Sequence, residues 1–224
     1  MALLCLAVAT VAGAAVHAGL VRSPTRAQRA AAAAEAVADR WRSWPAGRIF
    51  PATLSYSTSL LTTETASRVA ISSQASCPAA VEARVARLAL RDECSAGVRA
   101  TYVDQLQGVL YTVGVLAFPD AQRAAAFAAG LHAAAAGSIP LRALALPGTA
   151  SALFSAAAVQ TGTIRQSGSF VVLTAAGYAD GEPAGSGQES RRSVFAPAGQ
   201  LAGEIIAPLV RPVTVNCRSP EWTC

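Results

Sequence analysis

The first 21 residues of the chain form an apolar stretch without a charged side chain. About 20 apolar residues in a helix are enough to cross the hydrocarbon core of a bilayer, which is roughly 30 Å thick. Residues 1–21 are therefore expected to be an uncleaved transmembrane anchor or a secretory signal cleaved before Gly19. We favour the anchor, because the stretch lacks the basic residues that open most signals. A single stretch of this length excludes a polytopic transporter.

The composition predicts a folded domain behind this stretch. Apolar residues make up 53% of the chain and charged residues 14%, which excludes a disordered chain. The net charge of +5 comes from arginine alone, since the sequence contains no lysine. These arginines are spread along the chain, so no nucleic-acid partner is expected. Their densest group follows the apolar stretch directly, which indicates that the partner there is a membrane surface.

Four cysteines lie beyond the apolar stretch: Cys77, Cys94, Cys217 and Cys224. An even number favours disulfides, and of the three pairings that four cysteines allow we favour the local pairs Cys77–Cys94 and Cys217–Cys224. Zinc ligands usually lie two to four residues apart or include histidine, and neither pattern occurs here, so no metal or cofactor is expected. Disulfides place the domain outside the cytoplasm, attached to the plasma membrane by a single span. The arginines after the apolar stretch indicate the opposite topology by the positive-inside rule.

Periodicity predicts an α+β domain with a mainly antiparallel sheet and helices packed on one face. The expected organisation is an anchor or signal at 1–21, an alanine-rich stalk helix at 22–45, an extracytoplasmic domain at 46–210, and a tail at 211–224 in which a second disulfide closes a small ring. The main expected elements are helices at 78–91, 119–136 and 194–210, and strands at 98–103, 109–118, 140–146, 158–165 and 170–178.

Two tryptophans share one face of the predicted stalk helix, which Pro45 ends. Trp41 and Trp44 are expected to lie either at the lipid interface or against the domain core. We slightly favour the core.

The sequence contains no recognisable catalytic motif of the serine hydrolase, zinc protease, nucleotide or dinucleotide classes. Asp180 and Glu182 are the carboxylates that best fit a hydrolase, but they lie in a turn after a strand, where Asp is common. The polar residues at strand ends are the better candidates for one wall of a ligand groove, although a core strand with a tyrosine at its rim explains them as well. These candidate binding residues are Arg99, Tyr102, Asp104, Tyr111, Tyr178 and Asp180.

Four motifs resemble a family of uncharacterised actinobacterial single-pass membrane proteins. They are RATYVD at 99–104, TVGV at 112–115, ALPGTA at 145–150 and VVLTAAGYADG at 171–181. This resemblance implies no activity and no catalytic residues. The layout alone, an anchor followed by a disulfide-braced α+β domain, is faintly similar to the extracellular sensor domains of mycobacterial receptor kinases.

These observations together predict a non-catalytic, membrane-anchored domain that binds a cell-envelope ligand or a partner protein. The alternative is a structural or assembly subunit of a membrane complex, in which the small residues Ala12, Gly13 and Ala14 let helices pack closely. An envelope hydrolase of unrecognised type is the least favoured expectation.

Overall fold

The computed structural model describes residues 23–58, 60–72, 74–134, 139–185 and 193–217, together with 219 and 222. Residues 34–213 form one compact unit, which contains the whole sheet. Helix α2 (Arg26–Ala38) begins outside that unit and ends within it. The predicted anchor or signal and Cys224 lie outside the described residues, so the expectations placed on them stay predictions.

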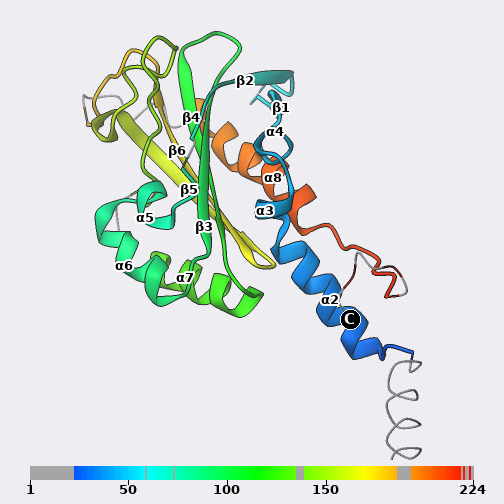
Figure 1. The fold of residues 1–224 in the computed structure, drawn as a ribbon. Helices are drawn as coiled ribbons and strands as arrows, with labels where there is room; N and C mark the ends of the chain where they lie inside the picture. Colours follow the sequence, from blue (N-terminus) through cyan, green and yellow to red (C-terminus); the bar gives the residue numbers. More distant parts are fainter. Residues whose placement is uncertain are drawn as a thin grey trace, which may run out of the picture. The chain divides into compact units, whose positions relative to one another are not determined.

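Six antiparallel strands form a single sheet, which confirms the predicted α+β class (Figure 1). The strand order is β1-β2-β3-β4-β6-β5, and all neighbours are antiparallel. The strands are β1 (Thr53–Ser57), β2 (Thr63–Ile71), β3 (Ala96–Val103), β4 (Val109–Ala117), β5 (Val159–Ser167) and β6 (Phe170–Tyr178). Strands β4 and β6, which both have neighbours on either side, are almost entirely buried, whereas edge strand β1 alternates between buried and exposed residues.

Helices cover both faces of this sheet, which corrects the prediction that they pack on one face (Figure 1). Helix α8 (Pro197–Val210), with α3 (Arg40–Ser43) and α4 (Ala46–Ile49), covers the first face. The second face carries α5 (Cys77–Ala80), α6 (Ala83–Arg91), α7 (Ala121–Ala134) and the 3-10 helix η1 (Ala156–Ala158). The physical reason lies in β4 and β6, which are apolar at successive positions and need cover on both sides.

Helix α8 provides most of the cover on the first face. Within the described residues, the segment Ser193–Val210 is the one helix long and apolar enough to cross a membrane, and 44% of it is buried in this structure. Leu201, Ile205 and Leu209 lie in the core against the sheet. Its apolar composition is thus accounted for by packing within the domain.

The segment before β1 is attached to the end of α8 by an arginine. Arg40 donates hydrogen bonds from Nη1 to the carbonyl oxygens of Pro208 (3.0 Å) and Leu209 (2.8 Å). A cation there satisfies carbonyls that the end of the helix leaves unpaired. Trp41 and Trp44 pack against the core of the first face, which confirms the favoured of their two expected positions.

A disulfide joins Cys77 to Cys94, with the two Cα atoms 6.2 Å apart, and confirms the first predicted pair. Cys77 begins α5, and Cys94 lies two residues before β3. The bond therefore holds α5 against the second face of the sheet. At the contact, β3 carries Gly97, where an added Cβ atom would lie 2.9 Å from the Cα atom of Cys77 and from the Cβ atom of Ala80. The absence of a side chain at Gly97 allows this close approach.

Replacing both Cys77 and Cys94 with serine is expected to lower the free energy of unfolding by about 3 kcal/mol, because the bond closes a loop of 17 residues in the unfolded chain. Urea denaturation of the two oxidised proteins measures the difference. Reductant should destabilise the native protein and have a smaller effect on the double variant. Equal sensitivity to reductant would show that this bond does not stabilise the fold.

Candidate functional site

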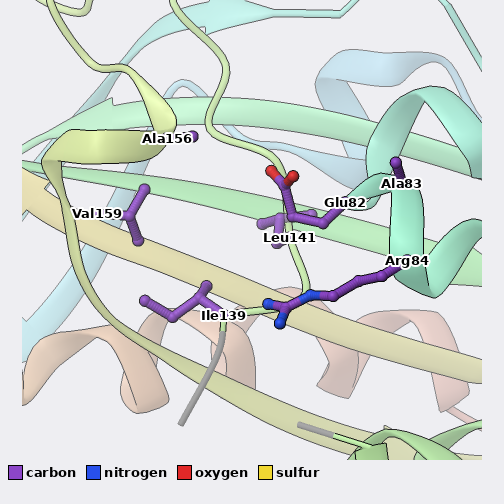
Figure 2. Close-up of a pocket in the computed structure, with 7 residues that line it drawn as sticks. All are labelled: Glu82, Ala83, Arg84, Ile139, Leu141, Ala156 and Val159. Carbon is purple, nitrogen blue, oxygen red and sulfur yellow. The ribbon is translucent and has the colours of Figure 1, made fainter.

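The second face of the sheet carries an open pocket of about 520 Å³ (Figure 2). It lies between the start of α6, the chain at 139–141, η1 and the beginning of β5. Its size falls in the range of small-molecule sites. The lining residues are Glu82, Ala83, Arg84, Ile139, Leu141, Ala156 and Val159.

The floor of the pocket is formed by an extended chain segment, residues 139–146, here called the floor segment. It contains the whole of the predicted strand 140–146, but it forms no ladder with the sheet, which corrects that prediction. Its one bridge pairs Leu141 with Val81, which follows α5. The backbone N–H of Glu82 donates to the carbonyl of Pro140 at 2.9 Å, and that of Arg142 donates to the carbonyl of Ala80 at 3.0 Å. These two bonds attach the floor segment to the pocket wall.

Two strand glycines bring the floor segment close to the sheet. A Cβ atom at Gly114 of β4 would collide with the end of the Leu141 side chain. One at Gly162 of β5 would lie 2.7 Å from Cγ2 of Ile139 and 2.5 Å from the carbonyl oxygen of Thr174. Glycine within a strand commonly marks such a close approach. Ile139 and Leu141 therefore occupy space that larger strand residues would fill.

A pair of buried threonines holds the next part of the floor segment. The hydroxyl of Thr101 donates to the carbonyl of Leu144 at 2.7 Å, and the backbone N–H of Leu144 donates to the hydroxyl of Thr112 at 3.0 Å. The two hydroxyl oxygens are 2.8 Å apart, and because Thr101 already donates to Leu144, its oxygen accepts from Thr112. Every polar group in this buried network has a partner, as buried polar groups require.

Arg99 is the one predicted site residue that contacts the floor segment. Its Nη1 donates to the carbonyl oxygen of Arg142 at 2.8 Å and, more weakly, to that of Ala143 at 3.4 Å. Burial lowers the pKa of Arg99, and the charge of Arg142 lowers it further, while the Glu82 carboxylate acts in the opposite direction. The guanidinium is thus a positioning group for the pocket floor and does not line the pocket.

The charged wall of the pocket consists of Glu82 and Arg84, at the start of α6. Figure 2 shows both side chains extending in the same direction from that wall toward the aliphatic floor. Among the described residues, neither side chain has a hydrogen-bond or ion-pair partner. The backbone N–H groups of Ala83 and Arg84 also have no acceptor among the described residues. Val85 is the first residue of α6 whose N–H donates to the carbonyl oxygen of Glu82.

The predicted tyrosines lie on the first face of the sheet, away from this pocket. Tyr102 donates to the carbonyl of Pro51 at 3.0 Å and Tyr111 to that of Val194 at 3.3 Å, and burial raises the pKa of both hydroxyls. The ring of Tyr178 packs edge-on against Phe195 with centroids 5.0 Å apart. All three tyrosines contribute to the core of that face.

The two predicted aspartates hold turns at strand ends. Asp104 is buried and accepts hydrogen bonds from the backbone N–H groups of Gly108 (2.7 Å) and Val109 (2.8 Å). Asp180 is exposed and accepts one from Glu182 at 3.0 Å. Neither Asp180 nor Glu182 lines the pocket. The six predicted site residues are therefore divided between both faces and the turns, and a ligand bound by all of them stays a prediction.

Across the described residues, no group of three or more His, Cys, Asp and Glu side chains could hold a metal ion. Comparison of the chain with protein-family models, curated proteins and solved structures finds no match. Any role of the pocket must therefore be argued from its own geometry and chemistry. Sequence reasoning missed it because none of the lining residues belongs to a motif. The glycines at 114 and 162, each within a predicted strand, were the signal that a segment crosses the sheet closely.

Replacing Arg99 with methionine is expected to lower the free energy of unfolding by about 2 kcal/mol, because the carbonyls of the floor segment lose the charged donor that the buried Arg99 supplies. Chemical denaturation measures this loss. Arg84→Met is the matched control, since Arg84 is exposed and has no partner within the described chain, and its stability should stay near that of the native protein. If the two variants lose stability equally, Arg99 does not hold the floor segment.

Proposed function

We propose that the protein is a membrane-anchored, extracytoplasmic, non-catalytic domain that binds a small cell-envelope ligand in the pocket between α6 and the floor segment. The observation that carries the proposal is the pocket itself. It combines unpaired charged groups with an aliphatic floor in a space of suitable size.

Support for the location comes from the Cys77–Cys94 bond, since disulfides persist in oxidising compartments. The bond holds α5, and α5 leads within two residues to the charged wall at Glu82. The same covalent bond that favours an exported domain therefore also fixes one side of the pocket. An exported binding domain would account for both the disulfide and the pocket beside it.

Support for binding comes from how the pocket is built. Arg99 and the threonine hydroxyls hold residues 142–144 of its floor, and the bonds of Pro140 and Arg142 to the chain at 80–82 hold Leu141 in place without a ligand. A preformed site binds without the cost of ordering its own groups. The remaining polar groups, Glu82 and Arg84, face the pocket and are available to a ligand.

Binding in this pocket is tested with a panel of small amines, carboxylates, amino acids and sugars, measured by calorimetry on the purified protein. The Ala156→Phe variant places an aromatic ring in the pocket lining. It is expected to lower the affinity of any compound that binds there by at least about tenfold, because the ring occupies the space of the ligand. The neighbouring Ala157→Phe serves as control, because Ala157 is exposed but does not line the pocket. Equal effects of the two variants, or no binding by any compound, would contradict the proposal.

The location is tested separately with reporters fused to the C-terminus of the full chain. A reporter that requires the oxidising exterior, such as alkaline phosphatase, is expected to be active, because Cys77 and Cys94 form their bond there. A fluorescent protein that matures only in the cytoplasm should stay dark. A bright cytoplasmic reporter with inactive phosphatase would exclude an exported domain.

A further inference from the structure

The pocket presents one negative and one positive side chain from the same wall. Glu82 and Arg84 are two residues apart, and no ion pair joins them to each other or to another side chain of the described residues. Glu82 is attracted electrostatically by the buried Arg99, but no hydrogen bond connects the two. Two opposite charges left unpaired in one pocket are complementary to a ligand that carries both charges.

The positive side of this wall is suited to a carboxylate. The guanidinium of Arg84 offers a planar pair of donors that fits carboxylate geometry. The backbone N–H groups of Ala83 and Arg84 begin the nine-residue helix α6 and have no acceptor in the described chain. Free N–H groups at a helix start attract an anion. Glu82 does not occupy them, because its side chain makes no capping bond to the helix.

The negative side of the wall is suited to an ammonium group. The carboxylate of Glu82 lies in the pocket lining, is partly exposed, and is open to a donor. A ligand with an anionic group alone would meet this carboxylate unfavourably, and a cation alone would meet Arg84 unfavourably. An ammonium group beside a carboxylate avoids both penalties.

The floor of the pocket selects the rest of the ligand. Ile139, Leu141 and Val159 are branched aliphatic side chains, and none of the lining residues that the structure describes carries an aromatic ring or a hydroxyl group. Such a surface favours a hydrocarbon group over a sugar or a planar ring, because a buried hydroxyl would lack a partner there.

We infer that this pocket binds a free aliphatic α-amino acid, with the ligand carboxylate at Arg84 and the start of α6, the ammonium group at Glu82, and the side chain on Ile139 and Leu141. This inference rests on the proposed function and names its ligand class. The binding involves no chemical step.

Calorimetry with L-leucine and three analogues tests each contact. N-acetyl-L-leucine lacks the ammonium charge, L-leucinamide lacks the carboxylate, and glycine lacks the aliphatic group. Each analogue is expected to bind at least about tenfold more weakly than L-leucine, because each leaves a charged group or the apolar floor without its partner. In the dipeptide L-leucyl-L-leucine the ammonium and carboxylate groups lie on different residues. It therefore tests whether these two groups come from a free amino acid or from the ends of a peptide.

Two charge-removing variants assign the contacts. Glu82→Gln should abolish the preference for L-leucine over its N-acetyl form while keeping the preference over the amide. Arg84→Gln should have the reverse effect. These selective losses cannot come from misfolding, because each variant keeps one preference. Arg87→Gln is the control, since Arg87 is exposed on α6 and does not line the pocket. It should keep both preferences.

The outcomes separate this inference from the function on which it rests. Binding of L-leucine with the expected analogue order supports both. If another compound of the panel binds, is weakened by Ala156→Phe, and L-leucine does not bind, the amino-acid inference is overturned and the pocket proposal stands. A dipeptide that binds more tightly than L-leucine overturns the free amino acid as ligand. No binding by any compound overturns both.

Discussion

The arrangement of the second face, including its pocket, depends on the close contact between the sheet and the chain segments that cover it. At Gly97, Gly114 and Gly162 the strands lack a Cβ atom, and α5 and the floor segment occupy that space. Backbone and aliphatic atoms can then pack directly on the strands. The disulfide at Cys77 and the donors of Arg99 hold these covering segments in place. The pocket is the space that remains above them.

The two faces of the sheet perform different tasks. On the first face, α8 and the tyrosine rings fill the interior, and the tyrosine hydroxyls of β3 and β4 bond to nearby carbonyl oxygens. That face is a closed core. On the second face, the helices and the floor segment leave room for a pocket whose charged side chains have no partner among the residues that the structure describes. A rigid core beneath a partly open layer is a common way of holding a binding site in position.

The strands and the first disulfide could be predicted from sequence, because a period of two and a spacing of 17 residues are local signals. The second helical layer could not, since it depends on which faces of β4 and β6 need cover. The floor segment was predicted as a strand from its apolar residues, yet its polar backbone groups bond to Arg99, Thr101 and Thr112. The alignment of Gly114 with Leu141 depends on strand register and three-dimensional packing, which composition does not encode.

Of the seven residues that line the pocket, three lie in connecting segments, two in α6, one in η1 and one in β5. The glycines and threonines that hold the floor segment belong to strands. A substitution at position 82, 84 or 156 therefore changes the pocket lining and leaves the contacts between the floor segment and the strands in place. The positions that set the chemistry of the pocket and the positions that hold its floor are largely separate in this fold. Chains that share this framework can accordingly differ in the residues that line the pocket, since positions outside the packed core tolerate change more readily.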